Sequence, residues 1–246
     1  MSFFNNFNKE NLICAHRGFR KVFVENSLEA FISSLEFCDF IEFDIQFTKD
    51  YIPIITHDET LKRCSNISKL EEFKKYKPWY IKDLEFNQIK KLNYKKTKIA
   101  SLEEFLILAK DKKIVFNLEI KQMQKEINEI KALEVLLLLL KKYNISCEIL
   151  ISSFNHNYLK YISQNSDFSI AVLDEEVKRK DLINYLKDLK AVSYNISKKA
   201  VNQLDINALK QNNIEVLVYT VNDQEEIKRL FKQGIKAVFT DYIPKS

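Results

Sequence analysis

Apolar residues along the chain follow two alternating patterns. Short runs rich in β-branched and aromatic residues, typical of strands, alternate with longer segments whose apolar residues recur at helical spacing. The predicted strands are Leu12–Ala15, Phe40–Gln46, Ile114–Ile120, Glu148–Ser152, Ser169–Val172, Ala191–Tyr194, Glu215–Thr220 and Lys236–Phe239. The predicted helices between them are Ser27–Phe37, Leu102–Lys110, Glu126–Lys142, Asn157–Ser163, Lys178–Leu186, Val201–Gln211 and Asp223–Lys232. Eight strands alternating strictly with helices predict an α/β fold, a parallel sheet closed into a (β/α)8 barrel.

Two stretches depart from this alternation. Residues Leu61–Ala100 are rich in lysine and weakly periodic, which indicates a long insertion after the second strand, preceded by a short extended piece at Ile52–Thr56. Only seven residues follow Phe239, too few for an eighth helix. We therefore expect one domain over residues 1–246 whose ring of helices has a gap, covered either by residues 2–10 or by a second copy of the chain in a homodimer.

Composition and charge narrow the class of protein. Hydrophobic residues make up 46% and charged residues 30% of the 246 residues, the balance of a globular protein with a sizeable core. The formal net charge of +5 is a mild excess spread along the chain and does not argue for a nucleic-acid partner. The most apolar run, Val135–Leu140, is far shorter than the ~20 residues needed to span a bilayer. The N-terminal residues also lack the pattern of a secretory signal.

Cysteine and glycine usage adds two expectations. The four cysteines form no C-x-x-C motif and are predicted to be free thiols in a reducing compartment, so we expect a cytoplasmic protein. They are Cys14, Cys38, Cys64 and Cys147. The chain has two glycines, where average usage predicts roughly 17, so Gly18 and Gly234 are expected where no side chain fits.

Two helix starts carry a capping pattern, a polar residue followed three positions later by glutamate. The segments are Asn26-Ser27-Leu28-Glu29 and Asn222-Asp223-Gln224-Glu225. They favour Asn26 and Asn222 as the N-cap residues of their helices.

Polar residues occupy one face of the second and third predicted strands. Glu42, Asp44 and Gln46 share one side of the second strand, opposite a fully apolar side. Asn117, Glu119 and Lys121 share one side of the third strand. A solvated strand face or a simple Glu–Lys ion pair would also explain these patterns. In a barrel, however, the acidic faces point into the lumen, where buried carboxylates need a positive partner.

Two of the three histidines lie just beyond predicted strand ends. His16 and His57 follow the first strand and the short extended piece, and Arg17 is next to His16. The third, His156, lies in a loop and is interpreted as a surface residue. The carboxyl ends of barrel strands form the face where active sites are built, so His16 and His57 should converge with the acidic residues.

Charge counting at this face predicts a ligand. Glu42, Asp44 and Glu119 contribute −3, and Arg17 and Lys121 contribute +2. Two carboxylates ~4 Å apart repel by about 4 kcal/mol at an effective dielectric constant near 20. One divalent cation relieves this repulsion, and ligands that are all oxygen favour Mg²⁺ or Ca²⁺ over zinc. The site then carries a net charge of +1, which one phosphodiester anion would neutralise.

At these residues the sequence resembles the glycerophosphodiester phosphodiesterase family, relatives of the phosphatidylinositol-specific phospholipases C. The matching motifs, in order along the chain, are Ala15-His16-Arg17-Gly18, Glu25-Asn26-Ser27, Glu42-Phe43-Asp44, Thr48-Lys49-Asp50, Pro53-x-x-x-His57-Asp58, Leu102-Glu103-Glu104, Glu119-Ile120-Lys121, Ser152-Ser153-Phe154, Thr220-Val221-Asn222 and Gly234…Thr240-Asp241. The resemblance implies a TIM-barrel hydrolase that releases sn-glycerol 3-phosphate and an alcohol from a small glycerophosphodiester.

The resemblance also implies roles for individual residues. Those implied to bind the divalent cation are Glu42, Asp44 and Glu119. His16 and His57 would be the general acid and base, in an order left open, and Arg17 and Lys121 would bind the phosphate. Two positions differ from the family pattern: Tyr51 follows Thr-Lys-Asp where glycine is usual, and Tyr219 replaces a frequent tryptophan. Tyr219 would contact the glycerol carbons or belong to the core.

Three questions stay open at the level of sequence. The attacking group is either the substrate's own 2-hydroxyl, giving a cyclic phosphate, or a water molecule. The second question is the substrate: the protein could instead be a phospholipase C- or D-like enzyme that acts on intact lipid. Aromatic residues of the insertion, such as Trp79, Tyr80 and Phe86, would then supply an apolar rim. The third question is whether the protein is an enzyme at all. A barrel that binds an anion without catalysis is disfavoured, because binding alone needs no pair of histidines.

Overall fold

The chain forms a closed barrel of parallel strands in the computed structural model, which describes residues 2–145 and 148–244. Within these residues the barrel strands are β1 (Leu12–His16), β2 (Phe40–Phe47), β4 (Phe116–Ile120), β5 (Ile149–Ser153), β6 (Ser169–Asp174), β7 (Ala191–Ser197), β8 (Glu215–Tyr219) and β9 (Ala237–Thr240). Each pairs in parallel with its neighbours, and β1 pairs with both β2 and β9, which closes the sheet. The short β3 (Pro53–Ile55) pairs antiparallel with β2. The predicted (β/α)8 barrel is confirmed.

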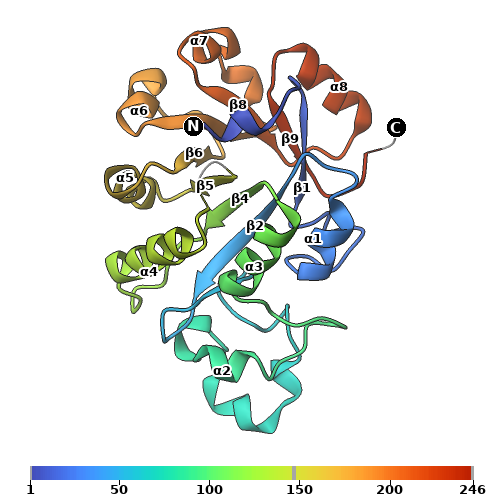
Figure 1. Cartoon of the computed structure of the whole chain (residues 1–246), viewed down its shortest axis with the longest axis vertical. Coiled ribbons are helices and arrows are strands. Elements are labelled where there is room, and N and C mark those ends of the chain that lie inside the picture. The colour runs from blue at the N-terminus through green and yellow to red at the C-terminus, as the bar shows by residue number, and fades with distance from the viewer. Residues whose placement is uncertain (1, 146–147, 245–246) are drawn as a thin grey trace.

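Helices follow the barrel strands and surround them on the outside (Figure 1). They are α1 (Leu28–Ser34), α3 (Leu102–Lys112), α4 (Glu129–Lys142), α5 (His156–Asn165), α6 (Leu182–Asp188), α7 (Ile206–Gln211) and α8 (Gln224–Lys232). The helix predicted over Val201–Gln211 is divided into a 3₁₀ turn, η5 (Val201–Gln203), and α7. The division occurs because the Asp205 side chain accepts a hydrogen bond from the Ala208 amide and starts a new helix. Cys147 lies outside the described residues.

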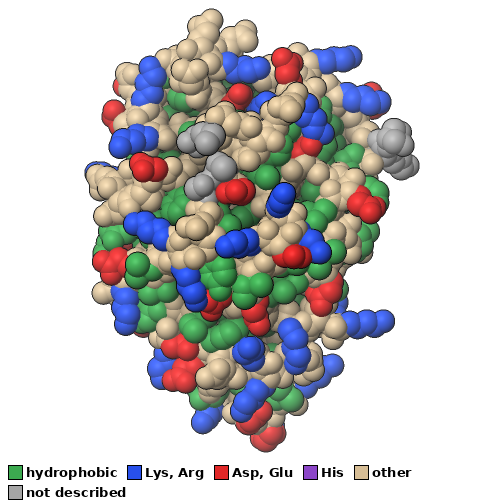
Figure 2. Space-filling view, in the orientation of Figure 1, with side chains coloured by type: hydrophobic (Ala, Val, Ile, Leu, Met, Phe, Trp, Pro, Cys, Tyr) green, Lys and Arg blue, Asp and Glu red, His purple; other side chains and the backbone are tan. Residues whose placement is uncertain are grey.

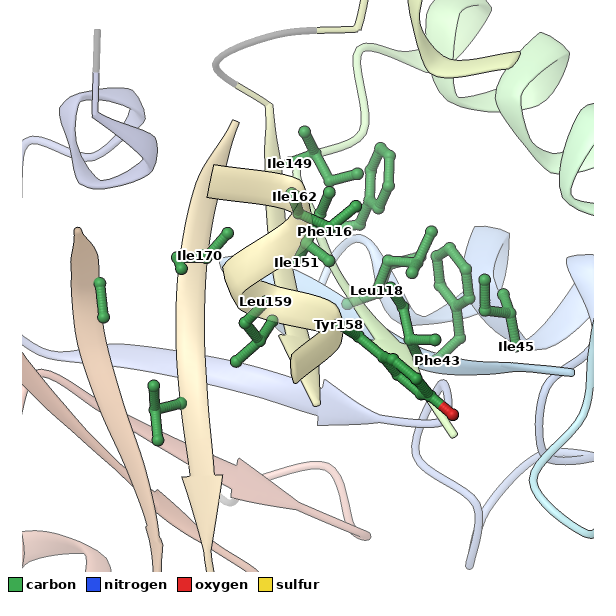
Figure 3. Packing of buried hydrophobic residues seen from close by; sticks show 14 of the residues in the cluster. Phe43, Ile45, Phe116, Leu118, Ile149, Ile151, Tyr158, Leu159, Ile162 and Ile170 are labelled. Atoms are coloured by element: carbon green, nitrogen blue, oxygen red, sulfur yellow. The ribbon is translucent and has the colours of Figure 1, made fainter. Parts of the chain in front are cut away.

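The apolar face of β2 packs against the helices, as its alternation predicted. Phe43 and Ile45 are fully buried in the main hydrophobic cluster. The ring of Phe43 lies 4.5 Å from that of Phe105 on α3, centroid to centroid. Figure 3 shows the side chain of Tyr158, on α5, extending toward Phe43 and Leu118 on the outer side of the strands. This packing leaves the opposite, acidic face of β2 directed into the barrel.

The N-terminal residues close one end of the barrel. The 3₁₀ turn η1 (Phe3–Asn6) places Phe3 in a buried cluster with Leu12 and Phe40, the first residues of β1 and β2. The Phe3 amide donates a 3.0 Å hydrogen bond to Ser169 Oγ at the start of β6. The expectation that residues 2–10 cover the gap in the helix ring is therefore wrong, because Phe3 is buried between strand starts instead.

The tail after β9 contacts the loop that follows β1, since the Lys21 amide donates a 3.1 Å hydrogen bond to the Asp241 carbonyl. Val238 of β9 and Ala15 of β1 are fully buried in the main cluster, which also contains Phe19. Ile243, in the tail after β9, packs against that cluster. Gly18 precedes Phe19 with φ +71°, and a Cβ there would lie 2.9 Å from the Cβ of Ala30, so this glycine meets the expectation that no side chain fits.

The insertion at 61–100 has a hydrophobic cluster of its own. Its elements are η2 (Ile67–Lys69), η3 (Glu71–Tyr76), η4 (Ile81–Asp83) and α2 (Phe86–Ile89). In Figure 1 they extend beyond the end of β2, at the bottom of the view. Trp79 is buried in this cluster, and its indole N–H donates a 3.0 Å hydrogen bond to the Phe73 carbonyl. The tryptophan is thus core of the insertion and gives no exposed lipid-binding rim.

The two helix caps lie one residue later than predicted. Ser27 Oγ accepts a 3.2 Å hydrogen bond from the Ala30 amide at the start of α1. Asp223 Oδ1 accepts a 2.8 Å bond from the Glu226 amide at the start of α8. Asn26 and Asn222 are therefore not N-caps, and both side chains turn instead toward the ends of the strands.

Candidate active site

Three carboxylates meet inside the barrel at the carboxyl ends of β2 and β4. The two strands pair so that Asp44 lies beside Glu119 and Glu42 beside Asn117. Each of Glu42, Asp44 and Glu119 offers one oxygen, and these oxygens lie within 4.8 Å of one another. Glu42 and Asp44 are buried and Glu119 is nearly so. Strand register thus brings together three acids that are separated in the sequence.

Burial and mutual repulsion oppose ionisation of two of these acids. Burial, together with the charges of Asp44 and Glu119, holds the pKa of Glu42 well above its ordinary value. Burial and the Asp44 charge likewise raise the pKa of Glu119 to about 7. For Asp44 burial acts in the same direction, but Arg17 and Lys121 outweigh it and lower its pKa. Arg17 and Lys121 therefore compensate only part of the negative charge of these three carboxylates.

The donor atoms suit a hard divalent cation. Glu42 Oε1 and Asp44 Oδ1 are buried and have no hydrogen-bond partner in the described parts of the chain, and neither has Asn26 Oδ1. The Asn26 side chain donates a 3.0 Å bond to Asp44 Oδ2, so its amide is held against the cluster. Three carboxylates and a neighbouring amide supply only oxygen, the ligand type that Mg²⁺ and Ca²⁺ prefer. The cluster could therefore hold a metal ion.

Two cations border the acidic cluster. The Arg17 amide donates a 3.0 Å hydrogen bond to Glu42 Oε2, and Arg17 Nε lies 3.1 Å from Asp44 Oδ2. Lys121 Nζ donates a 2.6 Å bond to Glu119 Oε1 and lies 3.7 Å from Asp44 Oδ1. Both side chains are mostly buried. They stand where an anion bound beside the carboxylates would meet positive charge.

His16 is oriented by a carboxylate from the far end of the chain. Its Nδ1 is 2.6 Å from Oδ1 of Asp241, which lies just after β9, and its Nε2 is 3.9 Å from Glu42 Oε2. Asp241 also accepts bonds from Arg20 Nε at 2.7 Å and from Asn222 Nδ2 at 3.2 Å. Burial lowers the pKa of His16, and the hydrogen bond with Asp241 opposes that effect. A carboxylate at Nδ1 keeps the ring proton there and leaves Nε2 free for chemistry.

His57 has the same kind of partner from a different element. Its Nδ1 is 2.8 Å from Oδ1 of Asp58, and 33% of its side chain is exposed. Burial lowers its pKa, whereas the Asp44 charge raises it. Two imidazoles whose Nδ1 atoms face carboxylates are a suitable pair for one proton abstraction and one proton donation.

The two histidines face a common cavity of about 270 Å³. Arg17, Glu42, Glu119 and Lys121 line it with them, and Phe154, Leu173 and Tyr219 form an apolar and aromatic part of the wall. Tyr219 donates a 2.8 Å hydrogen bond to the Asp174 carbonyl, and its ring packs edge-on against Phe154 with centroids 6.0 Å apart. Tyr219 therefore both packs in the wall and borders the space that a substrate would fill.

His156 does not belong to this site, and it is not a surface residue as the sequence suggested. It begins α5, its Nδ1 is 2.8 Å from the Tyr185 hydroxyl, and its Nε2 is 3.0 Å from the Leu173 carbonyl. Nδ1 thus joins α5 to α6 and Nε2 joins α5 to the end of β6, which is a structural role.

Sequence reasoning missed Asn26 and Asp241 as parts of the site. Both occur in the motifs that carry the family resemblance, but a capping role was assigned to Asn26 and none to Asp241. Neither contact is visible locally, since Asp241 is 225 positions from His16.

Comparison with known proteins agrees with the resemblance seen in the sequence. Residues 16–245 match the model of the glycerophosphoryl diester phosphodiesterase family. The chain belongs to this family. A glycerophosphodiester phosphodiesterase of Bacillus altitudinis is 30% identical over 243 residues, covering 94% of each chain. One from Caldanaerobacter subterraneus is 29% identical over 246 residues, again covering 94% of each chain.

Solved structures show that this phosphodiesterase has the fold of its relatives. A phosphodiesterase of Oleispira antarctica, in complex with the product sn-glycerol 3-phosphate, superimposes with a TM-score of 0.80 at 21% identity, covering 99% of this chain and 96% of the other. A glycerophosphodiester phosphodiesterase of Parabacteroides distasonis gives 0.80 at 20% identity, covering 96% and 94%. At these identities the likeness establishes the barrel, whereas the chemistry depends on the side chains that this chain places in it.

Proposed function

We propose that the protein hydrolyses glycerophosphodiesters to sn-glycerol 3-phosphate and an alcohol, with one divalent cation, Mg²⁺ or Ca²⁺, bound by Glu42, Asp44 and Glu119. The observation that carries the proposal is the meeting of this oxygen cluster with two carboxylate-oriented histidines in one cavity. The Oleispira phosphodiesterase, which shares the fold, holds the same compound, sn-glycerol 3-phosphate, as its product. The bound cation supplies Lewis-acid stabilisation of negative charge on the phosphoryl oxygens.

The side chains of the cavity supply binding and proton transfer. Lys121 and Arg17 place positive charge beside the phosphoryl oxygens, where negative charge grows in the transition state. One of His16 and His57 removes the proton of the attacking oxygen at its Nε2, and the other protonates the leaving alkoxide. Each such transfer typically contributes about 10²–10⁴-fold to the rate. Phe154 and Tyr219 offer apolar surface to the carbon skeleton of the substrate.

Release of glycerol 3-phosphate from purified protein tests the proposal. A panel of glycerophosphodiesters is assayed with Mg²⁺, Ca²⁺ and Mn²⁺, and chelation should stop the release. No release from any diester under any metal would refute the proposed reaction, and full activity in chelator would refute the metal. Phosphorus NMR of the turnover mixture separates attack by the substrate's 2-hydroxyl, which yields a cyclic phosphate, from attack by water.

Small diesters are favoured over intact lipid as substrates. Of the three aromatic residues expected to supply a lipid-binding rim, Trp79 is buried in the core of the insertion and Phe86 is partly buried against that core. In the part of the chain that the structure describes, no helix is both long and apolar enough to traverse a bilayer. Lysine, arginine and acidic side chains are interspersed over the face shown in Figure 2. Faster turnover of vesicle phosphatidylcholine than of glycerophosphocholine would reverse this preference.

A further inference from the structure

Outside the cavity, the guanidinium of Arg63 joins two carboxylates, each of which is hydrogen-bonded to a residue of the site. Arg63 donates to Asp58 through Nε, at 2.6 Å, and through one terminal nitrogen, at 2.9 Å. It donates to both oxygens of Glu25 at 2.9 Å. Asp58 is the partner of His57, and Glu25 accepts a 3.2 Å bond from a terminal nitrogen of Arg17. The five side chains form one continuous chain of hydrogen bonds that ends on His57 and on Arg17.

The geometry of this bridge uses what is particular to arginine. A guanidinium presents its N–H groups in a rigid planar fork, so it can hold two carboxylates with two bonds each and fix their orientation. Lysine carries the same charge as a single point and cannot form both pairs of bonds. The hydrogen bonds from Arg63 are also the largest cause that lowers the pKa of Asp58, to about 2. Asp58 is therefore a charged acceptor for His57 over the whole physiological range.

Arg63 belongs to the insertion, whose core holds it in place. Its neighbours Leu61 and Cys64 are buried in the cluster of the insertion. The Leu61 amide donates a 3.0 Å bond to the Trp79 carbonyl, and Cys64 Sγ lies 3.3 Å from Oγ1 of Thr56, the residue before His57. Among the described residues, none from 61–100 lines the cavity. The insertion therefore meets the site through this bridge, from outside.

We propose that Arg63 is a positioning residue, which orients His57 through Asp58 and Arg17 through Glu25, and that one function of the 61–100 insertion is to supply it. The inference rests on the proposed phosphodiesterase function. Its physical basis is the position of His57, which follows a strand of three residues and is partly exposed. Among the described residues, the hydrogen bond that its ring makes is with Asp58. A displacement of about 1 Å in a reacting group can cost about 100-fold in rate.

Substitution of Arg63 in the full-length protein tests the proposal. Arg63→Met should lower kcat about 10- to 100-fold with the metal saturating. Arg63→Lys, which keeps the charge but not the fork, should fall between Arg63→Met and the wild type. The matched control is Arg229→Met on α8. Its side chain is 49% exposed against 47% for Arg63, and it has one acidic partner, Glu226, at 3.8 Å. The control should keep the wild-type kcat.

A double-mutant cycle separates positioning from a general effect on the fold. Asp58→Asn alone should also lower kcat, and adding Arg63→Met to it should cost clearly less than Arg63→Met costs in the wild type, because Arg63 acts on His57 through Asp58. Losses that multiply fully would overturn the action of Arg63 on His57 through Asp58, and an Arg63→Met variant with wild-type kcat would overturn the positioning role as a whole. If the methionine variant does not fold, Arg63→Lys decides the question, and a wild-type kcat in that variant likewise overturns it. Absence of turnover in the wild-type protein would instead overturn the proposed function.

Discussion

Removing one charge from the acidic cluster should stabilise the metal-free protein. Glu119 lies beside Asp44 across the β2–β4 pairing, with Glu42 close by, and its pKa is raised from 4.5 to about 7. At about 1.4 kcal/mol for each pKa unit, ionising Glu119 in the folded protein costs about 3 kcal/mol more than in the unfolded chain. The rise in pKa already includes the favourable Lys121 contact. Glu119→Gln cannot ionise and removes this cost.

The pH dependence has a defined sign. An acid whose pKa is raised by folding destabilises the fold above its unfolded pKa, and the cost grows until its folded pKa is reached. In chelator, Glu119→Gln and the wild type should therefore unfold at similar temperatures near pH 4.5. The variant should become progressively more stable up to about pH 7. A gain of about 3 kcal/mol in a chain of this length corresponds to a rise of about 6–12 °C in the unfolding midpoint.

Metal should reverse the order of stability. A cation at 1,000 times its dissociation constant stabilises the wild type by about 4.1 kcal/mol, or about 8–16 °C, which exceeds the gain of about 3 kcal/mol from the substitution. The variant has lost a ligand and should gain far less from metal. Thermal unfolding followed by fluorescence or calorimetry, with chelator and with Mg²⁺ or Ca²⁺, measures both effects. Glu225→Gln, an exposed glutamate on α8 paired with Lys228, is the control and should behave as the wild type. A Glu119→Gln variant less stable than the wild type in chelator at pH 7 would refute the reasoning.

Three further substitutions have defined outcomes. His16→Ala should lower glycerol 3-phosphate release by at least about 10²-fold, because a proton-transfer group is lost. The unfolding midpoint should stay near that of the wild type, because the neighbours of His16 remain packed. Near-normal turnover would contradict the role of His16. Asp241→Asn should lower kcat by about 10²–10⁴-fold, since an amide no longer holds the ring proton on Nδ1 of His16, and a pH–rate profile like that of the wild type would argue against this. Gly18→Ala should lower stability by about 1–3 kcal/mol, because residue 18 has φ +71° and the new Cβ would lie 2.9 Å from the Cβ of Ala30; an unchanged midpoint in thermal unfolding would show that the turn relaxes instead.

Several features of the protein were open to prediction because they depend on short-range pattern. The alternation of β2 places Phe43 on one face and Asp44 on the other, whatever the rest of the chain does. The order of strands and helices implies a parallel barrel, and a barrel directs the polar face of β2 inward. The inward faces of the strands, together with the excess of negative charge there, predict that Glu42, Asp44 and Glu119 bind a metal ion. The grouping of these acids is observed, and their role as metal ligands stays a prediction.

Other features were decided by contacts between distant segments. Pairing of β1 with β9 brings Asp241 to His16, and nothing near either residue in the sequence indicates it. Asn26 has the sequence of a cap, yet Ser27 fills that position and Asn26 turns toward Asp44. Arg63 reaches Glu25 and Asp58 only because the insertion folds around its own core. Residue spacing determines which face a side chain takes, whereas closure of the barrel and packing of the insertion determine which partners that face meets.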